Sequence, residues 1–284
     1  MPTQFTLVIL LWKFPGDRNV STTFFTGSTY NTDDKTSRAF LDKLAMNTRI
    51  YFMAKYIEIV LKTRREALDG IYDTEHWIKS SADIFRLIES CGGKFHLTGL
   101  DNIRSSPEPM VFVGNHMSTL ETMTLPCIIA PEKEVTFAVK ESLVRHPFFG
   151  AVMRSRNPIV VGRENSREDL VVVLKKGQEL LAAGTSVIIF PQSTRMVKFI
   201  PEKFNSLGVK LAAAAKVKVV PFAIKTDYWE IGKVVKDLGK ISRHKPIYMD
   251  FGEPFEVSGS GKKENSKIID FITVHLKEWG AEVA

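Results

Sequence analysis

Two short segments of this chain carry side chains whose types and spacing suit proton transfer and anion binding. The first is Gly114-Asn115-His116-Met117-Ser118-Thr119-Leu120-Glu121. A neutral imidazole can take a proton from an attacking hydroxyl, and a carboxylate on its second nitrogen fixes the tautomer and stabilises the imidazolium. If a helix begins near Ser118, Glu121 lies within reach of His116. We therefore interpret His116 as a general base that Glu121 orients, with a purely structural histidine as the alternative.

The second segment is Phe190-Pro191-Gln192-Ser193-Thr194-Arg195, which follows a β-branched run. A strand that ends in an arginine, two hydroxyls and free backbone N–H groups can hold a phosphate, because a guanidinium binds phosphate through two hydrogen bonds. Arg163 follows another apolar run and supplies a second basic strand end. An ordinary turn with a solvated arginine is the alternative. Backbone N–H groups at the helix start after His116 are, in addition, candidate donors to an oxyanion.

The elements that must position these segments alternate, from Lys94 onward, between short β-branched runs and helical stretches. Such alternation predicts an α/β fold with a mixed, largely parallel sheet flanked by helices. Chemistry in these folds collects at the carboxyl ends of the strands, where both polar segments lie. The candidate strands are residues 95–98, 110–113, 135–139, 158–161, 187–190, 217–224 and 247–251, and the clearest helices are 167–183, behind a Ser166 cap, and 266–279.

The chain before Lys94 divides into two zones. Residues 13–38 are rich in Thr, Ser, Asn and Asp, so we interpret residues 1–45 as disordered or as a non-native extension, with Met46 as the natural start. Residues 46–93 are predicted to form an N-terminal helical segment of two helices broken near Gly70. The first helix carries a broad apolar face followed by basic residues, which is typical either of docking on a membrane interface or of packing on the main domain, residues 94–284.

Composition limits the classes of partner. With 44% hydrophobic and 25% charged residues, the chain is neither wholly disordered nor a polytopic membrane protein. The net charge of +7 favours an anionic partner. Because no nucleic-acid-binding motif is present, we expect lipid headgroups or phosphorylated metabolites rather than nucleic acid. Residues 5–12 are too short to span a bilayer and lack a basic n-region, so we expect no spanning helix and no secretory signal. The two cysteines are in no zinc-ligand pattern, so we expect no metal site.

The order and spacing of four blocks resemble the glycerolipid acyltransferase family, which contains the 1-acylglycerol-3-phosphate and glycerol-3-phosphate O-acyltransferases. The family's N-H-x-x-x-x-D block is similar to Asn115, His116 and Glu121, and its F-P-E-G-T-R block is similar to residues 190–195. Its second block, which ends in an arginine, looks like residues 140–163, and its apolar V-P run looks like residues 219–224. The resemblance spans residues 94–256, so residues 94–284 would form an acyltransferase domain.

The resemblance implies that His116 deprotonates an acceptor hydroxyl, which attacks the thioester of acyl-CoA or acyl carrier protein while Glu121 orients the imidazole. The implied acceptor is 1-acylglycerol 3-phosphate (lysophosphatidate), an intermediate of phospholipid synthesis, and no metal or redox cofactor is required. The residues implied to hold the acceptor are Arg163, Gln192, Ser193, Thr194 and Arg195.

Three positions depart from the family pattern. Glu121 replaces an aspartate, and Gln192 and Ser193 replace a glutamate and a glycine. These departures leave open a different acceptor, such as glycerol 3-phosphate or another lysolipid, or a non-catalytic protein that binds lipid or tethers membranes. In each case we expect a cytoplasmic protein that associates peripherally with an anionic membrane surface.

Overall fold

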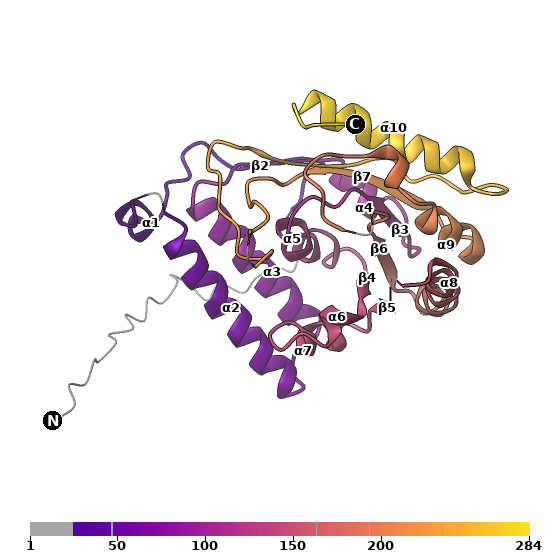
Figure 1. The fold of residues 1–284 in the computed structure, drawn as a ribbon, viewed down its shortest axis with the longest axis horizontal. Helices are drawn as coiled ribbons and strands as arrows, with labels where there is room; N and C mark the ends of the chain where they lie inside the picture. Colours follow the sequence, from indigo (N-terminus) through magenta and orange to yellow (C-terminus); the bar gives the residue numbers. More distant parts are fainter. Residues whose placement is uncertain (1–24, 47, 163, 193, 234) are drawn as a thin grey trace.

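The fold is built around one mixed β-sheet, seen in a computed structural model that describes residues 25–46, 48–162, 164–192, 194–233 and 235–284 (Figure 1). Within these residues the sheet has eight strands in the order β1-β2-β8-β7-β3-β6-β4-β5. Their bounds are β1 Tyr30–Asn31, β2 Phe95–Thr98, β3 Val111–Gly114, β4 Val135–Lys140, β5 Ile159–Val161, β6 Ser186–Ile189, β7 Val219–Lys225 and β8 Ile247–Phe251.

Five neighbouring strands, from β7 to β5, run parallel to one another, whereas β8 is antiparallel to β7 and β1 is antiparallel to β2. The central strands β3, β6 and β7 are buried along their whole length, which explains their unbroken apolar sequences. The carboxyl ends of the five parallel strands meet at one edge of the sheet. The residues that follow each of these strands, including both polar segments, therefore lie on this side of the sheet.

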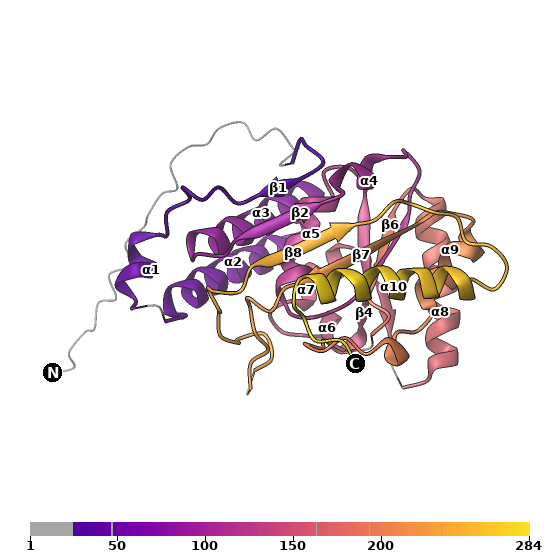
Figure 2. The same cartoon turned by 90° about the horizontal axis from the view of Figure 1, so that it is seen from above.

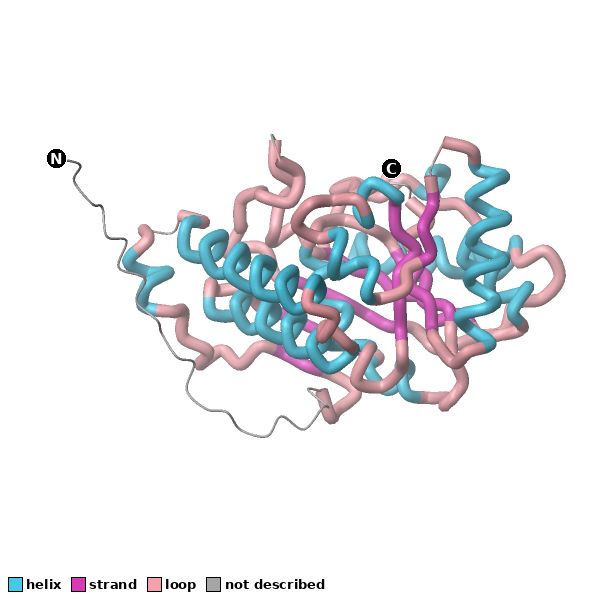
Figure 3. The backbone as a smooth tube through the Cα atoms, turned by 90° about the horizontal axis from the view of Figure 1, so that it is seen from below, coloured by secondary structure: helices cyan, strands magenta, loops and turns pink. Residues whose placement is uncertain are grey.

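Helices cover both faces of the sheet and form two apolar cores. One core joins the sheet to α2, α3 and α5, and the other joins it to α8, α9 and α10. Figure 2 shows α1, α2 and α3 grouped at one end of the molecule, away from α8 and α9, and Figure 3 shows helices lying over the strands. The helices are α1 Phe40–Leu44, α2 Ile50–Leu68, α3 Thr74–Ser90, α4 Leu100–Arg104, α5 Leu120–Ile129, α6 Glu141–Val144, α7 Gly150–Ser155, α8 Ser166–Ala182, α9 Leu207–Ala215 and α10 Lys262–Glu278, with a 3₁₀ turn at Pro201–Lys203.

The predicted α/β class and mixed, mostly parallel sheet are confirmed, as is the helical segment before it. The seven predicted strands correspond to β2–β8, and the predicted helix pair corresponds to α2 and α3. Two helix starts differ from the prediction. The side chain of Asn165, not Ser166, caps α8 by accepting a hydrogen bond from the Arg167 N–H, and α10 begins at Lys262, four residues before the predicted start.

Residues 25–45 pack on the domain, which differs from the expectation that the fold begins after residue 45. Strand β1 pairs with β2, and the hydroxyls of Tyr30 and Thr32 donate to Glu89 on α3, each at 2.7 Å. Asp42 on α1 is fully buried and pairs with Arg38 and with Arg243. The sequence signal for this stretch is weak because two-residue strands and one-turn helices carry no periodicity. Residues 1–24 lie outside the described residues.

Helix α2 packs on the domain, and part of its apolar surface stays exposed. One face, including Phe52, Tyr56 and Val60, is buried against the domain. On the other face, the side chains of Ile50, Ile57, Leu61 and Leu68 remain exposed. Among the helices of the described residues, none has the length and apolar character needed to cross a membrane. Both cysteines, Cys91 and Cys127, are buried, and burial raises the pKa of each thiol to about 12.

Candidate active site

The first polar segment leaves the sheet at the end of β3, in contact with the neighbouring strand β7. Gly114 is required here, because a Cβ atom would lie 2.3 Å from the Phe222 ring. The next residue, Asn115, is buried and exchanges two hydrogen bonds with the backbone of Ile224, at 2.8 and 2.9 Å. These contacts fix the turn that presents His116 at the carboxyl edge of the sheet.

The side chain of Glu121, in the first turn of α5, is fully buried and accepts hydrogen bonds from five donors. Its Oε1 lies 2.9 Å from Nδ1 of His116, 2.6 Å from the Met117 backbone N and 2.7 Å from the Ser118 backbone N. Its Oε2 accepts from the hydroxyls of Ser118 and Thr226, at 2.9 and 2.6 Å. The extra methylene of glutamate therefore does not prevent the contact with His116 that the sequence predicts.

These donors favour the ionised form of Glu121. Burial by itself would raise the pKa of Glu121, but the hydrogen bond and charge of His116, with hydrogen bonds from Thr226 and Ser118, outweigh burial and hold that pKa below its usual range. An ionised carboxylate only accepts hydrogen bonds, so Nδ1 of His116 carries the hydrogen. In the neutral imidazole, Nε2 is then left with its lone pair and can accept a proton.

Three backbone N–H groups at the start of α5 already have hydrogen-bond partners within the protein. Those of Met117 and Ser118 donate to Glu121, and that of Leu120 donates to the Ser118 hydroxyl at 3.0 Å. These three groups are therefore engaged within the protein, because Glu121 turns back to accept from two of them and the Ser118 hydroxyl accepts from the third. For the other N–H groups at this helix start, oxyanion binding stays a prediction.

The second polar segment, after β6, packs directly on the first. The ring of Phe190 stacks on the His116 imidazole with 4.3 Å between ring centroids, and the Met196 N–H donates to the His116 carbonyl at 2.9 Å. The side chain of Gln192 is buried, and its Oε1 accepts from the His116 backbone N–H at 2.9 Å. In this structure Gln192 thus contacts the loop that carries His116, and it does not line the neighbouring cavity. The contact with the acceptor that the resemblance implies for Gln192 stays a prediction.

Arg195 contacts the start of α5 and the connection between β7 and β8. Its Nη1 donates to the Thr119 hydroxyl and to Oδ1 of Asp237, the latter at 2.6 Å. Thr119 also donates to Asp237 at 2.9 Å. Thr194 is exposed beside this group. The predicted residues Arg163 and Ser193 lie outside the described residues.

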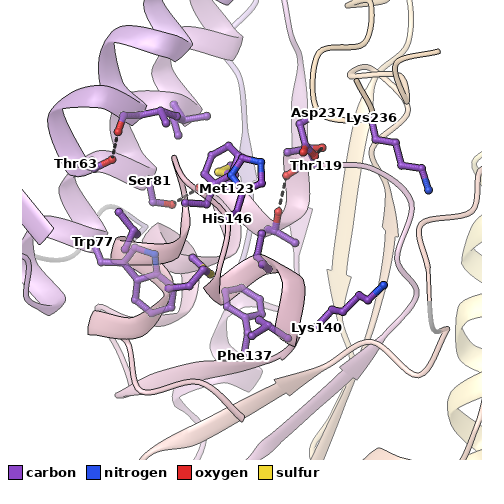
Figure 4. A pocket seen from close by; sticks show the side chains of 18 of the residues that line it. Thr63, Trp77, Ser81, Thr119, Met123, Phe137, Lys140, His146, Lys236 and Asp237 are labelled. Atoms are coloured by element: carbon purple, nitrogen blue, oxygen red, sulfur yellow. Dashed lines mark hydrogen bonds between the residues drawn. The ribbon is translucent and has the colours of Figure 1, made fainter. Parts of the chain in front are cut away.

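His116 and Arg195 share the wall of one cavity of about 640 Å³, a size typical of small-molecule sites. Its apolar lining comes from α2, α3, α5, β4 and the α6–α7 region. Figure 4 shows Lys140, Lys236 and Asp237 on the side of the cavity opposite Trp77 and Thr63. The cavity is therefore apolar at one end and charged at the other. Its lining includes Ile59, Val60, Thr63, Trp77, Ile84, Met123, Phe137, Val139, Leu143, His146, Phe149, Val152, Met153 and Phe190.

Several residues of this site were not assigned from the sequence. Thr226 follows β7 and Lys140 is the last residue of β4, so their position at a strand end was a usable signal. His146, Lys236 and Asp237 lie in segments without such a signal, and only the path of those segments brings them to the cavity. Among the described residues, no group of three or more His, Cys, Asp or Glu side chains is arranged to hold a metal ion.

Comparison with known proteins gives an independent view of this domain. A family model described as "Acyltransferase" matches residues 94–225, which contain His116, Glu121 and Arg195. The chain is 28% identical over 212 residues to a 1-acyl-sn-glycerol-3-phosphate acyltransferase of Pseudomonas aeruginosa, covering 74% of this chain and 77% of the relative. It is 33% identical over 131 residues to the chloroplastic 1-acyl-sn-glycerol-3-phosphate acyltransferase LPAT1 of Arabidopsis thaliana, covering 46% of this chain and 36% of that relative.

The fold is also similar to a solved structure. The crystal structure of a 1-acyl-sn-glycerophosphate acyltransferase from Thermotoga maritima matches with a TM-score of 0.62, covering 86% of this chain and 99% of that chain. At 18% sequence identity, this likeness concerns the fold alone.

Proposed function

Since this chain belongs to the acyltransferase family, we propose that it transfers an acyl chain from acyl-CoA or acyl carrier protein to the free hydroxyl of 1-acylglycerol 3-phosphate. The His116–Glu121 pair, in the wall of an apolar cavity that also contains Arg195, is the observation that carries this proposal. The choice of acceptor follows the names of the relatives, and the apolar cavity could hold an acyl chain.

The chemistry follows from the hydrogen-bond pattern. Nε2 of His116 takes the proton of the acceptor hydroxyl while its oxygen attacks the thioester carbonyl carbon. The carboxylate of Glu121 accepts a hydrogen bond from Nδ1 of His116, and its negative charge stabilises the imidazolium that forms. When the tetrahedral intermediate collapses, the carbon–sulfur bond breaks, and the thiolate takes the proton back from His116. The histidine is thus regenerated neutral, and the products are the diacylated acceptor and the free thiol.

Charged side chains at the cavity suit a phosphate on the acceptor. Arg195, Lys140 and Lys236 all line the cavity, and guanidinium and ammonium groups bind phosphate through charge-assisted hydrogen bonds. Arg163, Ser193 and Thr194 remain proposed contributors on the basis of the family motif. Gln192 holds the loop that carries His116, because its Oε1 accepts a hydrogen bond from the His116 backbone N–H.

Acyl-transfer assays with labelled acyl-CoA test the proposal most directly. The acceptor panel contains 1-acylglycerol 3-phosphate, glycerol 3-phosphate and uncharged monoacylglycerol, each with wild type and His116→Ala. We expect the first acceptor to be preferred and the variant to lose about 10²- to 10⁴-fold in kcat with its fold intact. Preference for glycerol 3-phosphate would identify that compound as the acceptor. The absence of turnover with every acceptor would favour the alternative of a non-catalytic lipid-binding protein.

We further propose that α1 and α2 dock the enzyme on an anionic membrane. Exposed apolar side chains extend along this side of the molecule, and basic residues stand among them, including Lys43, Arg49 and Lys62. Apolar burial and basic residues near anionic headgroups both favour binding to such a surface. The exposed apolar set is Phe40, Leu41, Leu44, Met46, Ile50, Ile57, Leu61 and Leu68.

Vesicle sedimentation tests this surface. We expect the double variant Phe40→Asp, Ile50→Asp to lose binding to vesicles that contain anionic lipid, while its melting temperature stays close to that of wild type because both side chains are exposed. Val274→Asp, a change of an exposed apolar residue on α10, is the matched control and should bind vesicles normally. Equal binding by the double variant and the control would contradict the assignment.

A further inference from the structure

The guanidinium assigned above to the acceptor's phosphate already carries a counter-ion from the protein. Oδ1 of Asp237 lies 2.6 Å from Nη1 of Arg195, and the Thr119 hydroxyl contacts both groups. The side chains of Arg195 and Asp237 are 17% and 31% exposed, and both line the cavity. A phosphate that approaches Arg195 therefore meets a carboxylate at the same place.

Asp237 belongs to the connection between β7 and β8, residues 226–246, which has a firmly packed base. Trp229 is fully buried and packs edge-to-face on Phe52 and Tyr56 of α2, with ring centroids 4.9 and 4.8 Å apart. Beyond this base the chain turns back on itself, and the Gly232 N–H donates to the Lys236 carbonyl at 3.0 Å. Asp237 thus stands near the tip of a connection that is anchored at its root.

Positive charge surrounds the pair at the cavity. Lys236, next to Asp237 in the sequence, and Lys140, at the end of β4, are exposed and line the same cavity (Figure 4). Two ammonium groups favour the arrival of an anion, whereas the carboxylate opposes its contact with Arg195. Since one carboxylate carries a single negative charge and a phosphate monoester carries nearly two at pH 7, the monoester is the stronger partner for the guanidinium.

We propose that Asp237 is a specificity-determining residue that acts as a displaceable counter-ion. It neutralises Arg195 while the acceptor is absent, and the acceptor's phosphate monoester replaces it on the guanidinium. This inference rests on the proposed function, because it concerns the acceptor of that reaction. An anion weaker than a phosphate monoester does not displace Asp237, so the residue favours monoesters over weaker anions while weakening the binding of monoesters, and it leaves the binding of uncharged acceptors unaffected.

Asp237→Asn tests this competition. The amide keeps the size of the side chain and removes its charge, so the phosphate meets an unopposed guanidinium. We expect the KM for 1-acylglycerol 3-phosphate to fall about 5- to 10-fold, with the KM values for acyl-CoA and for uncharged monoacylglycerol unchanged. Glu132→Gln is the matched control, because Glu132 pairs with Arg104 at 3.2 Å, is similarly half-buried, and lies outside the cavity lining. It changes the net charge by the same amount and should leave every KM unchanged.

Titration calorimetry with inorganic phosphate separates this inference from the proposed function, because it needs no turnover. We expect phosphate to bind more tightly to Asp237→Asn than to wild type or to Glu132→Gln, even if no acceptor is acylated. Asp237→Ser serves as a second variant should the first fail to melt cooperatively. The inference would be overturned if phosphate bound no more tightly to both variants than to wild type, or if their KM for the acceptor stayed the same or rose. Asp237 would then serve to hold Arg195 in place.

Discussion

The charge of Glu121 is the feature of this site whose removal has the most sharply defined consequence. In Glu121→Gln, the side-chain carbonyl oxygen can keep the three contacts of Oε1, with Nδ1 of His116 and the backbone N–H groups of Met117 and Ser118. The new amide nitrogen then faces the hydroxyls of Ser118 and Thr226, which can rotate to accept from it. We therefore expect the variant to fold and to keep the tautomer of His116.

What the variant loses is the negative charge beside the imidazolium. A hydrogen bond to a charged group contributes about 1.5–3 kcal/mol net. If this contribution is lost only when His116 is protonated in the transition state, kcat falls by about 10- to 160-fold. The KM values should change little, because Glu121 is fully buried and touches neither substrate.

Steady-state acyl transfer with acyl-CoA and 1-acylglycerol 3-phosphate measures this loss, and circular dichroism with thermal melting verifies the fold. The chain offers a matched control in Asp250→Asn, because Asp250 on β8 pairs with His275 on α10 at 2.7 Å, away from the cavity. The control makes the same change from carboxylate to amide beside a histidine and should keep kcat within about twofold. A folded Glu121→Gln enzyme with a kcat within threefold of wild type would refute the reasoning.

Three other consequences of the structure can be measured. Gln192→Ala removes the side chain that accepts a hydrogen bond from the His116 backbone N–H. We therefore expect the free energy of unfolding, measured in denaturant titrations, to fall by about 1–3 kcal/mol, and kcat to fall with it. Unchanged stability would mean that water replaces the amide. Thr63→Phe places a ring in the apolar part of the cavity, so kcat/KM should drop more for long acyl donors than for short ones, and an equal drop would argue that the chain lies elsewhere. The hydrogen bond to Asp250 raises the pKa of His275, so the stability that this pair contributes, about 0.2–1 kcal/mol, is fully present below about pH 6.5 and lost as pH rises through the raised value. Melting temperatures should therefore separate wild type from Asp250→Asn at pH 5.5 more than at pH 9, and an equal separation would contradict this sign.

The order of elements was predictable because each carries a local signal. The apolar runs of β2–β8 are bounded by turn residues, and α2 and α3 have apolar positions at helical spacing. Exceptions are the elements too short for any period, β1 and α1, which are held by long-range contacts such as the pairing of Tyr30 with Leu97 and the burial of Asp42. Two helix starts differed from the prediction: Asn165 rather than Ser166 caps α8, and α10 begins at Lys262 behind Gly261, without a side-chain cap.

The pairing of His116 with Glu121 was also predictable, since both residues lie on one turn and their distance depends only on local geometry. Their proximity to Arg195 was predictable in outline, because β3 and β6 are parallel neighbours whose carboxyl ends meet. The sequence by itself therefore determined the chemistry of the site and the edge of the sheet that carries it.

Tertiary structure alone decided what surrounds that chemistry. The cavity is enclosed by α2 and α3, which precede the catalytic segments by many residues, and the counter-ion of Arg195 comes from Asp237, 42 residues further along the chain. No local pattern encodes such contacts, because they depend on how separate elements pack and on the path that the β7–β8 connection takes across the domain. For this reason the sequence identifies the groups that we propose take part in the reaction, while the packing of distant segments shapes the cavity beside them.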